Sequence, residues 1–266
     1  MASTRVTRLI GAALALGFAQ GASAADLGNY GGGGSLKDGP FMIQEAPRAS
    51  WYIRADGTYS SFDTPSITEN GISTLTEANI DNNFGYGGGI GLYFGHGFRG
   101  DVTIDHLSDT DVSANLPDPK STLPGLRQFG LSSTVVLGNL YYDFDWGNRF
   151  SPYVGVGLGV TRNKTSAGTV TDPCDCFNGT IDSGSDTHVA GAAMAGFTLK
   201  LRDRLSFDAG YRFLYLGSAD TGPVTATFGA TGGPGGQGAG TQVAEDPRVE
   251  DIHAHEFRFG LRYDIN

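Results

Sequence analysis

Charged side chains of opposite sign recur two residues apart inside short segments of this chain that are otherwise apolar. Arg54 with Asp56 is one such pair, and Arg99 with Asp101 is another. Side chains on a strand point to opposite faces with period two, so both members of a pair share one face. Arginine and carboxylate groups gathered inside a protein pair with one another. The pattern predicts a polar network of twelve residues: Arg54, Asp56, Arg99, Asp101, Asp105, Asp143, Asp208, Arg212, Glu256, Arg258, Arg262 and Asp264.

His106 and Ser108 form a second constellation that could do chemistry. Their spacing resembles that of outer-membrane lipid deacylases, in which a histidine activates a serine. Such a pair needs a carboxylate to orient the imidazole. No glutamate lies in the following twenty residues, and Asp105 and Asp109 are only neighbours in sequence. We therefore expect no catalytic residues and no enzymatic activity, with a lipid-modifying enzyme as a remote alternative.

Metal and disulfide chemistry have little support in the sequence. His253 and His255 share one strand face, but two ligands alone bind a metal poorly. Cys174 and Cys176 are the only cysteines, and a Cys-x-Cys is two ligands short of a structural zinc site. In an exported protein the oxidising compartment favours a disulfide between them. We expect that possible disulfide, no metal and no cofactor.

Eight segments of alternating apolar and polar residues must position these groups. The last segment shows the alternation best, with Phe257, Phe259 and Leu261 on one face and Arg258 and Arg262 on the other. The residues opposite the apolar face of the second segment are nearly all glycine, which leaves room for long side chains from neighbouring strands. The predicted strands cover residues 51–62, 83–94, 98–107, 132–144, 150–162, 187–200 and 205–216, and the stretch after residue 250.

The connections between these segments alternate long and short. The long ones cover about 63–82, 108–130, 163–186 and 217–250, and the short turns place both ends of the barrel segment, residues 51–266, on one side. A soluble sandwich could show the same alternation, with the charges on its solvated outside. Two features favour a closed transmembrane barrel instead: aromatic residues gather at strand ends, and nothing is left to cover the apolar face of the last strand. We predict an all-β fold, an eight-stranded antiparallel up-and-down transmembrane β-barrel.

The N-terminal residues are typical of a secretory signal. Arg5 and Arg8 precede an apolar run over residues 9–18, and small residues lead to Ala24. We expect residues 1–24 to be removed between Ala24 and Ala25, and residues 25–50 to form a flexible Gly-rich periplasmic leader. Loss of the two arginines would change the formal charge from −10 to −12, which argues against nucleic-acid binding.

Several segments carry a family resemblance. They are residues 98–103, 139–143, 151–157, 205–212 and 257–263, together with the leader at 34–40. Over residues 50–266 the chain resembles small alphaproteobacterial outer-membrane β-barrel proteins, whose barrel is similar to the membrane domain of OmpA and to opacity-type surface proteins. The resemblance implies assembly by the barrel-insertion machinery. The family's insertion signal usually ends in Phe, whereas this chain ends Ile265-Asn266, so Tyr263 is expected to supply the recognised aromatic residue.

An eight-stranded barrel has an interior that side chains just fill, so inward charges would form a plug. We therefore expect a structural surface protein of the Gram-negative outer membrane. Its loops would be extracellular, both termini periplasmic, and its partners outer-membrane lipid and lipopolysaccharide. The acidic loops, with Glu77 and Asp81 in the first and Glu250 and Asp251 in the fourth, suggest bridging divalent cations. A narrow porin-like channel for ions or small solutes remains the alternative.

Overall fold

The described part of the protein is built from strands. The computed structural model describes residues 50–69, 73–116, 125–147, 149–171, 177–228, 240–244 and 247–265. Across these ranges, no helix is long and apolar enough to cross a membrane.

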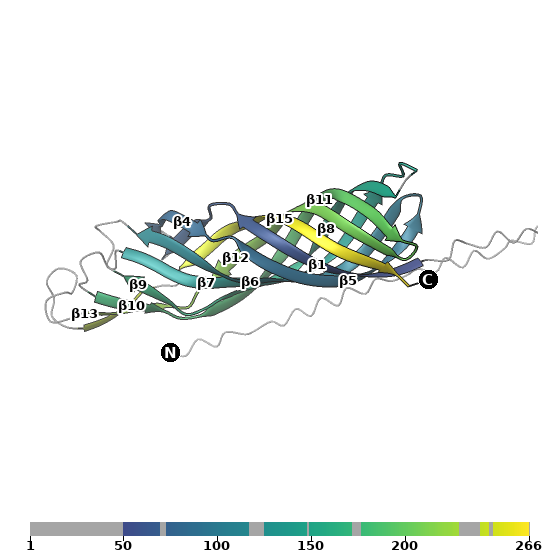
Figure 1. Ribbon diagram of the computed structural model, residues 1–266. Coiled ribbons are helices and arrows are strands. Elements are labelled where there is room, and N and C mark those ends of the chain that lie inside the picture. The colour runs from purple at the N-terminus through teal and green to yellow at the C-terminus, as the bar shows by residue number, and fades with distance from the viewer. Residues whose placement is uncertain are drawn as a thin grey trace, which may run out of the picture. The chain divides into compact units, whose positions relative to one another are not determined.

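Eight long strands close into a ring (Figure 1). They are β1 (Ser50–Phe62), β5 (Asn83–Gly95), β6 (Phe98–Leu116), β7 (Gly125–Asp143), β8 (Phe150–Thr165), β11 (Gly184–Arg202), β12 (Leu205–Asp220) and β15 (Arg248–Asp264). Each pairs antiparallel with its neighbour in chain order, and β15 pairs with β1 from Tyr52↔Asp264 to Phe62↔Ala254. The predicted eight-stranded antiparallel up-and-down barrel is confirmed.

The two ends of the ring differ. One end has the short connections. In the one between β5 and β6, Gly95, His96 and Gly97 all have φ between 54° and 85°, a region that favours glycine. The other end carries seven short strands: β2 (Ser66–Glu69), β3 (Ser73–Thr74), β4 (Thr76–Ile80), β9 (Gly168–Thr171), β10 (Phe177–Ile181), β13 (Val224–Phe228) and β14 (Gly240–Ala244). Four of these pair with one another in the order β9, β10, β13, β14, and β9 also pairs with the long strand β7.

The long strands continue further than the sequence pattern predicted. A loop was expected over 108–130, but β6 runs to Leu116 and β7 begins at Gly125. Likewise, β8 and β11 still pair at Thr165↔Gly184, inside the loop expected at 163–186. The extensions of β6 and β7 bury apolar side chains such as Val112 and Phe129 inside the ring. The extension of β8 buries Asn163 and Thr165, which bond to carbonyls of β12.

A belt of exposed apolar residues surrounds the ring. On β8, for example, Val156 is 61 % and Leu158 69 % exposed, whereas the intervening Gly157 points inward. The predicted outward faces of β1, β5 and β15 are confirmed by the same alternation. At the short-turn end the belt finishes in aromatic residues: Trp51, Phe94, Phe98, Tyr142, Phe144, Trp146, Phe150, Phe197 and Tyr263. Aromatic girdles of this kind flank the lipid-facing band of outer-membrane barrels.

Along β7 the apolar face changes sides. Val136 and Leu140 are exposed on the outside of the ring, whereas Phe129 and Leu131, further toward the long-connection end, are buried inside it. Over the same stretch Gln128 is exposed on the outside. The change from apolar-out to apolar-in marks where the strands leave the lipid-facing belt.

Candidate functional site

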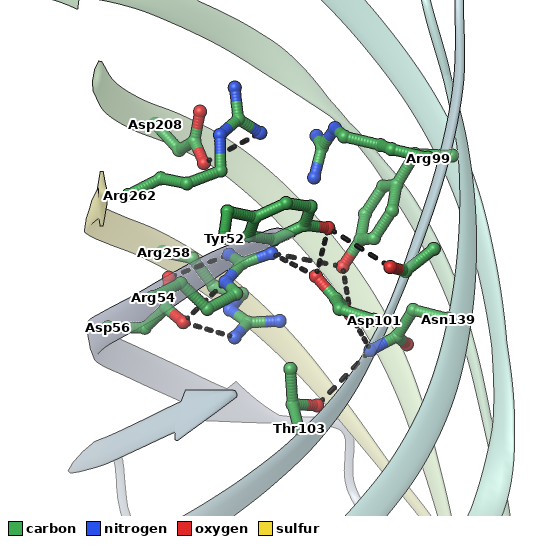
Figure 2. A network of polar contacts seen from close by, with 12 residues as sticks. Tyr52, Arg54, Asp56, Arg99, Asp101, Thr103, Asn139, Asp208, Arg258 and Arg262 are labelled. Carbon is green, nitrogen blue, oxygen red and sulfur yellow. Dashed lines mark hydrogen bonds and ion pairs between the residues drawn. The ribbon is translucent and has the colours of Figure 1, made fainter. Parts of the chain in front are cut away.

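A connected set of charged side chains fills the ring at the level of the belt (Figure 2). Ten of the twelve residues predicted for the network are buried; Asp143 and Asp264, nearest the short-turn end, are half-buried. The twelve residues come from five strands, β1, β6, β7, β12 and β15, so contacts between them tie opposite walls together. Thr198 adds β11 to the network by donating to Asp208 at 2.6 Å.

One part of the network centres on Arg54 and Asp101. The Arg54 guanidinium donates to both oxygens of Asp56, at 2.7 and 2.8 Å, and to Asp101 Oδ2 at 3.0 Å. Asp101 also accepts from the Tyr52 hydroxyl at 3.0 Å and from Asn139 Nδ2 at 2.8 Å. This carboxylate of β6 is therefore held by groups from two other strands, β1 and β7, and Figure 2 shows these contacts.

A second part centres on Arg212, whose side chain is fully buried. Arg212 donates to Asp105 at 2.6 Å and to Glu256, which also accepts from Ser60 Oγ at 3.1 Å. Arg258 joins the two parts, because its Nη2 lies 3.2 Å from Asp56 and 3.3 Å from Asp105.

The third part lies toward the short-turn end. Arg99 pairs with Asp143 at 2.8 Å and lies 4.0 Å from the centre of the Tyr141 ring. Arg262 pairs with Asp208 at 3.4 Å. Beyond them is a cavity of about 310 Å³, whose lining includes Arg262, Asp143, Lys200, Tyr93 and Asp264. The Tyr93 hydroxyl donates to Asp264 at 2.9 Å, so this last carboxylate belongs to the wall of the cavity.

Glycines on the inward faces make room for this network. A Cβ at Gly87 would lie 2.0 Å from an Asp105 oxygen, and one at Gly91 would lie 2.3 Å from the Tyr52 ring. A Cβ at Gly260 would lie 2.2 Å from an Asp56 oxygen. The space that the sequence predicted opposite the apolar face of β5 is thus occupied by network side chains.

Sequence reasoning missed the two tyrosines of the network. Tyr52 is fully buried and Tyr141 nearly so, and both bond to Asp101. The period-two spacing along the strand could have identified them. Tyr52 is two residues from Arg54 and Tyr141 is two residues from Asp143, so each tyrosine shares the inward face with a network residue.

Above the network the interior is apolar. A cluster of buried side chains includes Leu137, Ala190, Leu214, Leu216 and Ala254, none of which is exposed. It continues toward the long-connection end through Val112, Phe129, Val170, Ile181, Val224 and Val249. The ring is therefore filled in two layers, a charged one and then a mainly apolar one, in which a few polar side chains such as Asn163 and Arg127 are also buried.

Comparison with known proteins identifies this architecture. Residues 10–264 match the family model described as outer membrane protein beta-barrel domain. The chain belongs to this family. Its place is accordingly the outer membrane of a Gram-negative cell, and the predicted resemblance to alphaproteobacterial outer-membrane barrels is confirmed.

Related barrels are found in sequence and in structure. Uncharacterized proteins of Brucella suis biovar 1 and Brucella melitensis biotype 1 are each 25 % identical over 245 residues, covering 82 % of this chain and 85 % of theirs. Neisserial surface protein A is 16 % identical with a TM-score of 0.43, covering 81 % of this chain and 97 % of that one. The outer membrane protein OprG from Pseudomonas aeruginosa is 18 % identical with a TM-score of 0.47, covering 81 % and 96 %.

Among the described residues, no carboxylate lies within ion-pair distance of His106. His106 points outward, where its Nδ1 lies 3.1 Å from Thr134 Oγ1 and its ring contacts Tyr86. Asp105 points inward and is bonded to Arg212. Adjacent strand residues face opposite sides, so this aspartate cannot orient the imidazole.

His253 and His255 lie on the outward face of β15, among the aromatic side chains of β12. The Nε2 atom of His255 lies 3.1 Å from Asp63 Oδ1. Its Nδ1 atom forms a hydrogen bond with the Tyr211 hydroxyl. Within the described ranges no three His, Cys, Asp or Glu side chains are close enough together to hold one metal ion. Cys174, Cys176, Ala24 and Ala25 lie outside the described residues.

A cluster of charged groups lies beyond the belt, where β11, β12 and β15 reach the long-connection end. Asp220 is 3.3 Å from Arg248, and His188 is 3.5 Å from Asp186. Burial, and next a hydrogen bond with Asp186, raise the pKa of Asp220 to about 6. The charge of this carboxyl therefore changes in mildly acidic conditions.

Proposed function

We propose that this protein is a structural, non-catalytic barrel that supports the outer membrane and presents its long connections as a surface for interaction. The observation that carries the proposal is the two-layer filling of the ring. The charged layer is cross-linked by ion pairs between opposite walls, and the apolar layer above it is fully buried. Such a ring is a rigid support and a closed one.

Both layers oppose conduction, for different physical reasons. In the charged layer an ion would have to displace guanidinium and carboxylate groups that already satisfy one another. In the layer above, most of the lining is apolar, and hydrophobic constrictions exclude ions by dewetting. The polar groups buried there, such as Asn163 with Ser133 and the Leu216 carbonyl, are already bonded to one another. Arg212 and Leu214 show how closely the layers follow each other: two residues apart on β12, both are completely buried.

The orientation that we propose follows the two ends of the ring. Outer-membrane barrels have short periplasmic turns and longer extracellular loops. Here the described ends of the barrel meet at the short-turn end, where the Ile265 amide donates to the Trp51 carbonyl at 2.9 Å. We therefore place that end in the periplasm and the end with β9, β10 and β13 outside. Entry of the final strand through the barrel-insertion machinery would use its outward row of Phe257, Phe259, Leu261 and Tyr263.

The outer end would meet lipopolysaccharide. Asp81, Asp109 and Asp111 border one cavity of about 410 Å³ at that end, and Glu250 and Asp251 border the belt on β15. Carboxylates beside anionic lipid require divalent cations between them. If this bridging operates, removing Mg²⁺ and Ca²⁺ with a chelator should lower the unfolding temperature in lipopolysaccharide-containing vesicles. Neutralising Asp109 and Asp111 should abolish that effect, and an unchanged effect would contradict the bridge.

Single-channel recording tests the closed lumen. Protein comprising residues 25–266 is refolded, its folding checked by a heat-shifted gel band, and inserted into a planar bilayer. We expect no steps from the wild-type protein, and none from Arg212→Met, because the apolar layer is intact. Brief openings are expected when Leu137→Ser and Leu214→Ser are added to Arg212→Met. Long-lived steps from the wild-type protein would refute the proposal and support the narrow porin-like channel.

A further inference from the structure

Three basic residues border one pocket at the short-turn end. Arg149, Lys200 and Arg202 line a surface cavity of about 300 Å³ together with Leu201 and Asp203. Among the residues that the structure describes, no carboxylate lies within ion-pair distance of any of the three. The contrast with the lumen is direct, since Arg54, Arg212 and Arg258 each pair with two carboxylates.

The fold brings these residues together from two turns. The Lys200 amide donates to the Arg149 carbonyl at 2.8 Å, which ties the start of β8 to the end of β11. The pairing of β11 with β12 is irregular between Lys200 and Arg202, so the basic residues are not in simple alternation there. The pocket is thus held by backbone contacts between neighbouring strands.

The pocket also lies at the edge of the lipid-facing belt. Leu201, one of its lining residues, is 44 % exposed. Phe150, directly after Arg149, stacks on Phe197 with ring centroids 5.1 Å apart. An amphiphile at this position would meet unpaired positive charge and an exposed apolar surface next to each other.

We propose that this pocket binds the phosphate headgroup of an anionic glycerophospholipid, with the acyl chains lying against Phe150, Phe197 and Leu201. Guanidinium groups match phosphate oxygens with paired hydrogen bonds, and the lysine adds a point charge. Asp203 leaves the pocket with a net positive charge, which favours an anionic over a zwitterionic headgroup. The site rests on the orientation proposed above only for its assignment to the periplasmic leaflet, which consists of phospholipid.

Native mass spectrometry of the folded barrel in detergent tests the site by titration with phosphatidylglycerol and with phosphatidylcholine of the same acyl chains. The wild-type protein should prefer phosphatidylglycerol. Arg149→Gln with Arg202→Gln should weaken its binding about thirtyfold, or about fivefold for each charge. The matched control is Arg162→Gln with Lys164→Gln, which removes the same charge from exposed positions near the other end of β8 and should change binding less than twofold.

Three results would overturn the assignment. They are equal affinity of the wild-type protein for both lipids, equal losses in the two double variants, and displacement of the lipid by millimolar inorganic phosphate. The last would show a site for free phosphate. Lys200→Gln, expected to weaken binding about fivefold, provides the same test if the double variant fails to fold. These outcomes do not depend on whether the lumen conducts ions in the single-channel recording.

Discussion

Arg212 is the position where removal of one side chain should most weaken the barrel. Its guanidinium is fully buried and bonds to Asp105 and Glu256, whose side chains are also buried. Breaking a buried ion pair from one side typically costs about 3–5 kcal/mol, because a charge is left without its partner. Here Glu256 keeps the Ser60 hydroxyl and Asp105 keeps Arg258 at 3.3 Å. We therefore expect Arg212→Met to lower the free energy of unfolding by about 3 kcal/mol, the lower end of that range.

Equilibrium unfolding in urea, with the barrel in lipid vesicles and tryptophan emission as the signal, measures this loss. Adding Glu256→Gln to Arg212→Met should recover at least about 1 kcal/mol, since one stranded charge is removed. Arg248→Met is the control: this residue is 45 % exposed in its pair with Asp220, and its loss should cost about 0–1 kcal/mol. If Arg212→Met unfolds within about 1 kcal/mol of the wild-type protein, or if the second substitution makes it worse, the charged layer does not stabilise the ring as argued.

Three further results are expected. Gly87→Ala would place a methyl group 2.0 Å from a network carboxylate and should cost about 1–3 kcal/mol, whereas Gly57→Ala, with nothing within 4 Å, should be near neutral in the same urea experiment. NMR titration of the Asp220 carboxyl carbon should give a midpoint near 6. Because that pKa is above the unfolded value, the folded state holds more protons between about pH 4 and 6. The contribution of this group to stability is therefore lost as pH rises through that window, and a midpoint near 4 would contradict the burial. Leu158→Arg on the lipid face should cost about 2–4 kcal/mol of unfolding free energy, while Thr169→Arg beyond the belt should change it by less than about 0.5 kcal/mol. Similar costs at both positions would show that the belt is wrongly assigned.

The alternation of side chains predicted the faces of the strands well, because one rule of geometry governs it. Phe257, Phe259 and Leu261 point outward and Arg258 and Arg262 inward, whatever the neighbouring strands are. The number of long strands and their up-and-down order also followed from the sequence, since each alternating segment was separated from the next by turn or loop residues.

The pairings inside the ring could not be predicted in the same way. Arg54 bonds to Asp56 on its own strand and to Asp101 on β6, a choice fixed by register and by the space at the inward glycines. Spacing along one strand shows that two charges share a face, but it does not show the height at which charges from different strands meet. Tyr52 enters the network for the same reason, because its hydroxyl reaches across to β6.

The apolar layer was missed for a different reason. A period-two pattern was taken to have one apolar side throughout, the side that faces lipid. On β7 this holds at Val136 and Leu140 and reverses at Phe129 and Leu131, which were assigned in part to a loop. The reversed alternation in residues 128–131 was visible in the sequence, but it indicates a strand only if the ring continues beyond the membrane.

The order of the two layers follows from what surrounds the strands. Within the belt, lipid is as apolar as any core, so burying leucine inside the ring gains little over leaving it outside. There the interior is specified by directional bonds, such as those of Arg54 and Arg212. Beyond the belt the outside is water, burial of Phe129 and Val249 becomes favourable, and a mainly apolar core forms. Each layer therefore stabilises the ring where the other interaction would be weak, and a barrel whose strands extend past the membrane needs both.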